Sequence, residues 1–240
     1  MIILDQESFF RMYINDMLNT LWEYVFPLFC VLCGREGSAL CGRCLLTFDT
    51  SGVFDCPVCH EKGVVLCDDC APSSYIDRHL AILPYRHDGK SGTLIREFKY
   101  GFVESLTIPF GSLVHNFFNT HPSLCSSIDI IVPVPLHRRR CAERGFNQAE
   151  RLAHLVGSAL DRPVVPLLAR TRHTTHQARL KREARLSNVK DAFSLAGDAR
   201  DKTILLVDDV FTTGSTIQEC AKVLADGGAL RVSGFSMARG

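Results

Sequence analysis

Eight of the eleven cysteines form four CxxC pairs, a spacing typical of metal binding. A CxxC turn presents two thiolates, and two such turns facing each other complete the tetrahedral sulfur shell that zinc prefers. The second four cysteines follow the first four at a constant offset of 26 residues, so the segment is a tandem duplication of one CxxC-x7-CxxC unit. We therefore expect two structural zinc ions, with the ligands Cys30, Cys33, Cys41, Cys44, Cys56, Cys59, Cys67 and Cys70.

Other uses of these cysteines fit the sequence less well. A disulfide framework needs an oxidising compartment, and charged residues interrupt the apolar N-terminus where a secretion signal would lie. A thioredoxin-like redox motif needs one CxxC at a helix start rather than four in duplicate. Zinc ligands can come from one unit or be exchanged between units, and pairing within a unit is the simpler arrangement. Cys125, Cys141 and Cys220 stand apart and are expected to be ordinary thiols.

Two adjacent aspartates and several hydroxyl side chains follow an apolar stretch near the C-terminus. Asp208 and Asp209 come directly after residues 203–207, which are typical of a buried strand. Ligands bind beyond the carboxyl ends of such strands, and backbone N–H groups at a helix start bind phosphate. Two carboxylates suit the vicinal hydroxyls of a ribose because they only accept hydrogen bonds. The pattern predicts a ribose 5-phosphate site whose phosphate is held by Thr212, Thr213, Gly214, Ser215 and Thr216.

Two alternatives exist for this motif. An apolar strand that ends in Asp-Asp is also typical of a Walker B strand, but the chain has no GxxxxGK[ST] loop, which argues against ATP or GTP hydrolysis. Asp208 as a simple helix cap does not account for Asp209 and the hydroxyls together. Residues 204–216 instead resemble the phosphoribosyl-pyrophosphate motif of type I phosphoribosyltransferases at all thirteen positions.

Short apolar runs alternate with helical patterns from about residue 78, which predicts an α/β fold whose largely parallel sheet is flanked by helices. The predicted strands are His79–Tyr85, Ile128–Val134, Thr203–Val207 and Leu230–Ala238. The predicted helices are Ser91–Tyr100, Glu104–Asn119, Asn147–Leu160 and Ser215–Gly227.

Two basic stretches accompany these elements. Residues 137–151 contain five Arg against two Glu and follow a predicted strand. In a phosphoribosyltransferase the pyrophosphate would lie here, because the guanidinium fork binds phosphate oxygens bidentately. Residues 170–190 contain seven Lys or Arg against one Glu and occupy the position of the mobile loop that closes over the ligand in the type I fold. For most of these charged residues the alternative to ligand binding is a position in a solvated surface loop.

The segment PVPLHRRRCAERGFNQAE, residues 133–150, resembles the signature of the ComF family of competence and GntX-like proteins. The four CxxC pairs and DDVFTTGST match that family too, so the resemblance covers nearly the whole chain after residue 26. It implies a type I phosphoribosyltransferase-like domain that binds 5-phosphoribosyl-1-pyrophosphate and magnesium, with Asp208 and Asp209 as the catalytic pair. The resemblance implies that residues in the basic loops and near them bind the pyrophosphate, namely Lys99, His137, Arg138, Arg144, Gln177 and Arg185. Asn188 also matches the pattern of the family.

Two classes of function remain open. The first is a phosphoribosyltransferase, for which the sequence shows no acceptor pocket. The second is a non-catalytic accessory protein that binds single-stranded DNA through the same arginines, since DNA and pyrophosphate attract the same side chains. The resemblance implies a cytoplasmic role in DNA uptake, natural transformation or DNA utilisation, with DNA-uptake proteins as partners.

Composition and the N-terminus complete the expected organisation. A formal net charge of +1 means that any nucleic-acid surface must be local, and 46% hydrophobic residues suffice for a core. Residues 1–28 show the spacing of an amphipathic helix that docks on the core, a membrane surface or a partner, and no membrane span is expected. A double zinc ribbon over 29–75 and a phosphoribosyltransferase-like domain over 78–240 are expected to follow.

Overall fold

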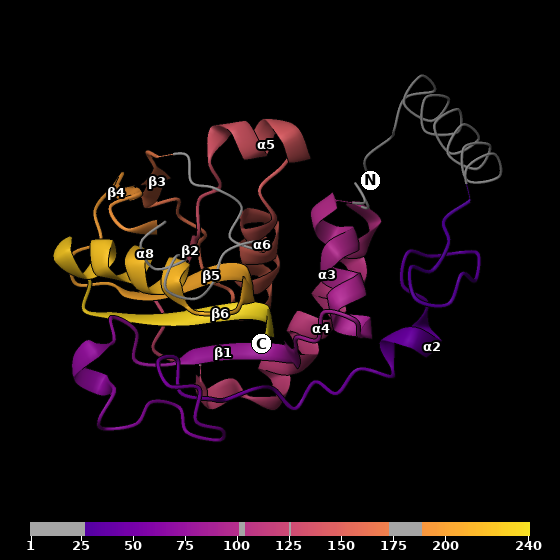
Figure 1. The fold of residues 1–240 in the computed structure, drawn as a ribbon, viewed down its shortest axis with the longest axis horizontal. Coiled ribbons are helices and arrows are strands. Elements are labelled where there is room, and N and C mark those ends of the chain that lie inside the picture. Colours follow the sequence, from indigo (N-terminus) through magenta and orange to yellow (C-terminus); the bar gives the residue numbers. More distant parts are fainter. Residues whose placement is uncertain (1–26, 101–103, 125, 173–188) are drawn as a thin grey trace, which may run out of the picture.

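Four parallel strands form the central sheet in the computed structural model, which describes residues 27–100, 104–124, 126–172 and 189–240. The strand order is β1-β6-β5-β2, and each neighbouring pair is parallel. The bounds are β1 His79–Pro84, β2 Ile130–Pro133, β5 Thr203–Phe211 and β6 Arg231–Arg239. The predicted α/β fold with a parallel sheet is confirmed, and the carboxyl ends of the strands lie along one edge (Figure 1).

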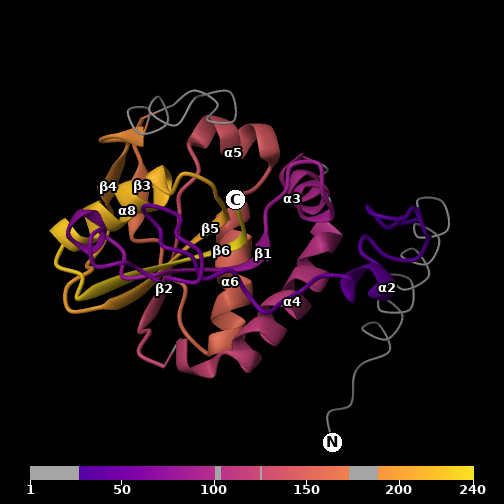
Figure 2. The same ribbon diagram turned by 60° about the horizontal axis from the view of Figure 1, so that its bottom comes forward.

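The apolar residues of the strands are divided between two cores, one on each face of the sheet. Leu205 and Val207 of β5 belong to one core, whereas Ile204 and Leu206 belong to the other. Successive side chains of a strand point to opposite faces, so β5 is buried on both sides, as its continuous apolar run predicts. Three helices cover the faces: α4 Thr107–Thr120 and α6 Gln148–Leu160 on one, and α8 Ser215–Asp226 on the other (Figures 1 and 2).

Two further helices border the carboxyl edge of the sheet. They are α3, Lys90–Tyr100, and α5, Arg138–Arg144 (Figure 1). Helix α5 was not predicted, because none of its residues is buried and it has no apolar stripe. Its ends explain why it forms. The His137 Nδ1 accepts a hydrogen bond from the backbone N–H of Arg139 at 3.3 Å, and Gly145 ends the helix with a φ of 81°.

Most of the other predicted boundaries agree with the structure to within two residues. The main difference is β5, which continues to Phe211 and therefore contains both aspartates. The antiparallel pair of β3, Leu168–Arg170, and β4, Phe193–Leu195, was not predicted because three residues are too few to show a period. The short elements are α2 Gly42–Leu45, η1 Ala71–Ser73, η2 Glu104–Leu106 and η3 Pro122–Leu124. Within the described ranges, no helix is both long and apolar enough to cross a membrane.

The two cysteine units lie at separate places on the sheet domain. Unit one, residues 30–44, lies near α4, whereas unit two, residues 56–70, lies near β1, β6 and α8 (Figures 1 and 2). Between the units, Val53 forms an antiparallel β-bridge with Ala81 of β1. The predicted helix over 1–28 falls almost entirely outside the described residues. The division into a 29–75 module and a 78–240 domain remains a prediction.

Candidate phosphate-ligand site and cysteine clusters

A cavity of about 340 Å³ lies at the carboxyl edge of the sheet. It is bordered by the ends of β2 and β5, by α3 and α5, and by the starts of α6 and α8. Ligands of open α/β sheets bind at this place, beyond the carboxyl ends of the strands. The charged and polar side chains in its wall include Tyr85, Lys99, Tyr100, Arg140, Arg144, Gln148, Arg170, Asp208, Asp209, Thr212, Thr213, Ser215 and Thr216.

Cations lie beside both aspartates of β5. The Lys99 Nζ lies 3.0 Å from Asp209 Oδ1, which ties α3 to the end of β5. Asp208 interacts electrostatically with Lys99 and also with Arg170 at the end of β3. Neighbouring residues of a strand point to opposite faces, so the pair reaches the cavity from both sides of the sheet edge.

Burial and neighbouring charges shift the pKa values of Asp208 and Lys99. Burial and the neighbouring Asp209 carboxylate raise the pKa of Asp208 to about 7, although Lys99 lowers it. Burial lowers the pKa of Lys99, but Asp209 and Asp208 raise it by more, so the pKa of Lys99 is raised overall. Lys99 is therefore cationic at neutral pH. Asp208 is a carboxylate that a cation or a hydrogen-bond donor from a ligand would stabilise in its ionised form.

The segment between β5 and α8 has the features of a phosphate loop. Its Gly214 occupies the N-cap position of α8 with a φ of 75°, so the N-cap residue has no side chain to bond to the first N–H groups of this 12-residue helix. A Cβ atom at Gly214 would lie 2.5 Å from Phe211 Cζ, so only glycine fits. Thr213 Oγ1 and Ser215 Oγ lie 2.8 Å apart and flank the turn. Backbone N–H groups at a helix start together with hydroxyls can bind a phosphate.

Three guanidinium groups, those of Arg140, Arg144 and Arg170, also lie in the wall of the cavity. Arg144 is held in place: its Nη2 donates to the Tyr100 hydroxyl and its Nη1 to Gln148 Oε1, both at 3.1 Å. Burial and the nearby Arg144 lower the pKa of Arg140, and burial and Arg140 lower the pKa of Arg170. The positive charges of these arginines repel one another, which costs free energy in the absence of a ligand. An anionic ligand bound between them would offset this repulsion.

Gln148 provides a further donor in the wall of the cavity. The residue is 2% exposed, and its Nε2 has no hydrogen-bond partner among the described residues. A buried donor without a partner costs about 1–3 kcal/mol, so its presence beside the arginines indicates a place for an acceptor oxygen of a ligand.

The structure brings some of the predicted site residues together and leaves others apart. Lys99, Arg144, the two aspartates and the loop 212–216 line one cavity. His137 caps α5 and Arg138 is exposed on it, and neither belongs to the cavity wall. Gln177, Arg185 and Asn188 lie outside the described residues. The assignment of His137, Arg138, Gln177 and Arg185 to pyrophosphate and the basic loops therefore remains a prediction.

Sequence reasoning did not single out Arg140, Arg170, Gln148 or Tyr100. One signal was available: Arg140 and Arg144 are four residues apart, so a helix over this stretch would have placed them on one face. The remaining three come from α6, β3 and α3, and only the folded chain brings them together.

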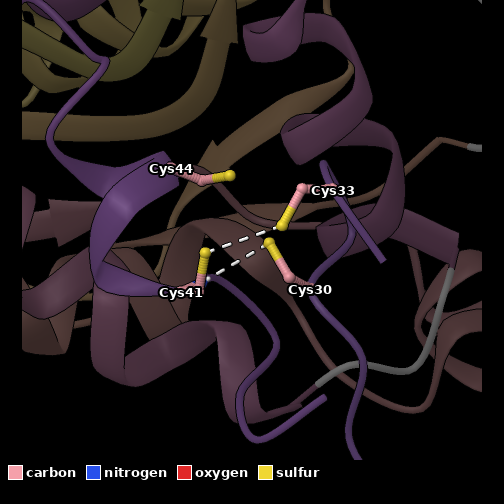
Figure 3. Close-up of side chains that lie close together, drawn as sticks. All are labelled: Cys30, Cys33, Cys41 and Cys44. Atoms are coloured by element: carbon pink, nitrogen blue, oxygen red, sulfur yellow. Dashed lines mark hydrogen bonds between the residues drawn. The ribbon is translucent and has the colours of Figure 1, made fainter. Parts of the chain in front are cut away.

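The four cysteines of each unit converge as a tetrahedral metal site requires. Figure 3 shows the sulfur atoms of Cys30, Cys33, Cys41 and Cys44 turned toward one another, and in both units the four ligand atoms lie within 4.8 Å of each other. Cys33 and Cys41 have their sulfurs 3.7 Å apart, and Cys56 and Cys67 have theirs 3.5 Å apart. Two sulfurs at ~2.3 Å from a tetrahedral centre would lie about 3.8 Å apart, whereas a disulfide needs about 2.05 Å.

All eight cysteines are free thiols, so the disulfide alternative is wrong. The four sulfur atoms of each cluster come from one unit, which is the simpler of the two ligand arrangements. Burial raises the pKa of Cys30, but backbone N–H groups of Cys41, Leu32 and Cys33 lower it by more, to about 6. Burial and the neighbouring thiols raise the pKa of Cys44 to about 12. Four thiolates this close can be ionised together only around a cation, and four sulfur ligands favour zinc.

Comparison with known proteins agrees with this architecture. The phosphoribosyl transferase domain family matches residues 141–234. Competence protein ComFC of Bacillus subtilis is 31% identical over 250 residues, which cover 93% of this chain and 100% of the relative. Competence protein F of Haemophilus influenzae is 38% identical over 115 residues, or 46% of this chain and 50% of that protein.

A third relative has a different name. The DNA utilization protein YhgH of Salmonella typhimurium is 40% identical over 115 residues, 46% of this chain and 49% of that protein. The matches to the Haemophilus and Salmonella proteins thus span about half of those relatives, whereas ComFC of Bacillus subtilis is matched over its whole length. With its phosphoribosyltransferase-type sheet and two N-terminal clusters of four cysteines each, the chain belongs to the ComF family.

Proposed function

We propose that the chain binds 5-phosphoribosyl-1-pyrophosphate with magnesium in the cavity at the end of β5, and that it uses this ligand in the handling of DNA. One observation carries the proposal: a single cavity has a helix N-terminus with a glycine N-cap, two adjacent carboxylates and three arginines in its wall. These groups match the 5-phosphate, the ribose diol and the pyrophosphate of that ligand in turn.

In this proposal, each part of the wall acts on one part of the ligand. The backbone of residues 212–216 binds the 5-phosphate, and Asp208 and Asp209 accept hydrogen bonds from the ribose hydroxyls. Arg140, Arg144 and Arg170 bind the pyrophosphate, and the Gln148 Nε2 donates to one of its oxygens. Asp208 and Asp209 would help to hold magnesium, which would neutralise negative charge on the ligand.

A transferase reaction would follow from the same arrangement. The bond from the sugar C1 to the pyrophosphate oxygen breaks while C1 gains a bond to an acceptor nucleophile, which loses its proton. The ionised Asp208 favours the positive charge that develops on the sugar, and the arginines stabilise the departing pyrophosphate. The acceptor is not assigned.

The experiment is a calorimetric titration of 5-phosphoribosyl-1-pyrophosphate with Mg²⁺ into the wild-type protein and the D208N/D209N variant. We expect binding to the wild type and a loss of at least about a hundredfold in the variant, because both acceptors of the ribose hydroxyls are weakened. Asp226→Asn is the matched control, since Asp226 is exposed at the other end of α8. If the wild type does not bind, or if the double variant binds as well as the wild type, the proposed site is wrong.

A second function, single-stranded DNA binding, is favoured by one specific contact. Tyr100 is 54% exposed at the cavity wall, and the Arg144 guanidinium lies 4.9 Å from its ring centroid. An exposed aromatic ring beside a cation is the usual platform for stacking bases. The names of the competence and DNA utilization relatives fit this function, and a cytoplasmic location with DNA-uptake proteins as partners belongs to the same proposal.

The two functions respond differently to salt. DNA binding through several phosphates falls steeply as salt increases, whereas one small ligand in a cavity responds less. We expect D208N/D209N to lose the small ligand and to keep electrostatic DNA binding, measured by fluorescence anisotropy of a labelled oligonucleotide. If DNA binding does not depend on salt, or is lost in step with the small ligand, the second function is not supported.

A further inference from the structure

We infer that unit two is part of the phosphate site, with Arg239 as the positioning residue between them, so that metal in unit two sets the affinity for the phosphorylated ligand. This inference rests on the proposed function of the cavity. It goes beyond a structural role for the metal, because it distinguishes two cysteine units that are repeats of each other in sequence.

The first contact is a buried cation between unit two and the sheet. Arg239, the last residue of β6, is 3% exposed. Its Nη1 donates to the carbonyl oxygen of Asp55 at 2.7 Å, and its Nη2 donates to the carbonyl oxygen of Cys56 at 2.5 Å. One guanidinium fork thus holds the backbone at the first metal ligand of unit two. Its positive charge also lies beside a cluster that would carry net negative charge with zinc and four thiolates.

The second contact connects Arg239 to the phosphate loop through Phe211. Phe211 ends β5 directly before Thr212, and it lies in register with Arg239 on β6. The Arg239 guanidinium carbon is 4.6 Å from the Phe211 ring centroid, and the His79 ring packs on Phe211 with centroids 4.0 Å apart. His60 of unit two approaches the same ring at 6.1 Å. Phe211 is therefore held between unit two and the loop that it precedes.

The third contact is direct. A Cβ atom at Gly214 would lie 3.3 Å from the carbonyl oxygen of Pro57, so the backbone of unit two packs against the phosphate loop itself. Just beyond unit two, the Tyr75 N–H donates to Gln218 Oε1 and the Gln218 Nε2 donates to Ser74 Oγ, both at 2.9 Å. These bonds fix the first turn of α8, whose N–H groups form the phosphate site.

A metal matters to these contacts because unit two cannot hold its own shape. Short cysteine ribbons bury little apolar surface, and metal binding supplies much of their folding free energy. Without a metal, the carbonyls of Asp55, Cys56 and Pro57 would lose the positions that the contacts require. Unit one differs: Cys30, Cys41 and Cys44 pack in the core with residues of α3 and α4 (Figures 1 and 2).

The duplication provides a matched pair of variants. Cys59→Ser with Cys67→Ser removes two ligands from unit two, and Cys33→Ser with Cys41→Ser removes the equivalent two from unit one. We expect each variant to lose one zinc per chain. The affinity for 5-phosphoribosyl-1-pyrophosphate with Mg²⁺ should fall about tenfold or more in the unit-two variant and stay within about twofold in the unit-one variant. Equal losses, or no loss in either, would overturn the inference.

A second measurement uses the wild-type protein alone. Coupling between two sites is reciprocal, so the ligand must raise the zinc affinity of unit two by the same factor as that zinc raises the affinity for the ligand. Equilibrium competition for zinc with a colorimetric chelator should show that the ligand raises the affinity of one of the two zinc sites about tenfold and leaves the other within about twofold. If both zinc affinities rise alike, or neither does, the inference fails.

Arg239→Gln tests the positioning residue with all cysteines intact. We expect this variant to keep two zinc ions and to bind the ligand about tenfold more weakly, while Arg231→Gln, at the exposed start of the same strand, changes neither. Unchanged affinity in Arg239→Gln would overturn the role of Arg239. A wild-type protein that binds no ligand would instead contradict the proposed function, so the two failures are distinguishable.

Discussion

Lys99 of α3 and Asp209 of β5 form an ion pair in the cavity wall, with 3.0 Å between Nζ and Oδ1. The sequence suggested that Lys99 could reach a phosphate, but in the structure its ammonium lies against a carboxylate. The pair links the helix that borders the cavity to the strand that carries both aspartates, and Lys99 also lowers the pKa of Asp208, which burial and Asp209 raise to about 7.

Replacing Lys99 should weaken ligand binding and shift its pH dependence. In Lys99→Met, Asp209 loses its cation and the pKa of Asp208 rises further, since Lys99 lowers it in the native protein. We expect calorimetry at pH 7.5 to show an affinity reduced about tenfold. Lys202→Met, on the exposed surface, is the control. An affinity equal to that of the wild type would show that the ion pair does not position Asp209.

Ligand binding should depend on pH through Asp208. Its pKa is raised to about 7 in the free protein, and a bound ribose or magnesium ion lowers it because both favour the ionised form. Affinity should therefore be full above pH 7 and fall about tenfold per pH unit below it. Titrations in buffers with different ionisation heats should show nearly one proton released at pH 6 and almost none at pH 8. Proton release that persists in Asp208→Asn would contradict this assignment.

Two glycines with left-handed backbone allow the loop geometry to be tested. Gly214→Ala and Gly145→Ala both place alanine at a positive φ, 75° and 81°, at a strain of about 1 kcal/mol. Only at Gly214 does the new methyl group collide with Phe211, whereas nothing lies within 4 Å at Gly145. We expect Gly214→Ala to lose most ligand affinity and more thermal stability than Gly145→Ala, by calorimetry and thermal unfolding. Equal effects would mean that the close packing at Gly214 is unimportant.

Gln148 should matter for the ligand and little for the fold. Gln148→Met keeps the volume and removes the buried Nε2 that has no partner among the described residues. Stability should change by less than about 1 kcal/mol, because the lost bond to Arg144 is balanced by removal of an unpaired donor. Ligand affinity should fall about tenfold if Nε2 donates to the pyrophosphate. A large loss of stability with unchanged affinity would assign Gln148 to the core instead.

Zinc content tests the cysteine clusters. We expect about two zinc ions per chain in reduced protein, measured by atomic emission, because each unit provides four thiolates in tetrahedral arrangement. A strong chelator at low pH should remove both ions and unfold unit two, since the ligands must be deprotonated to bind metal. A content near zero in freshly purified, reduced protein would contradict the zinc sites.

Features that depend on residues close together in the chain were predictable from the sequence. The duplicated CxxC pattern predicted the two clusters of four cysteines, and the run from Ile204 to Thr216 predicted the strand, turn and helix that meet at residues 212–216. Both are local: a knuckle or a strand–turn–helix brings its own ligands together. The alternation of apolar runs and helical patterns likewise predicted the α/β class, because the spacing of apolar residues within each element indicates which of its sides is buried.

The tertiary structure alone decided which distant residues meet. Lys99 pairs with Asp209, and Arg239 holds the backbone at Cys56. These residues lie far apart in the chain, and no sequence pattern predicts contacts between them. The same holds for Arg140 and Arg170, whose elements approach only when the sheet and its helices pack. Two units with one cysteine pattern therefore differ in their surroundings, since a ribbon's neighbours are set by where the rest of the chain packs.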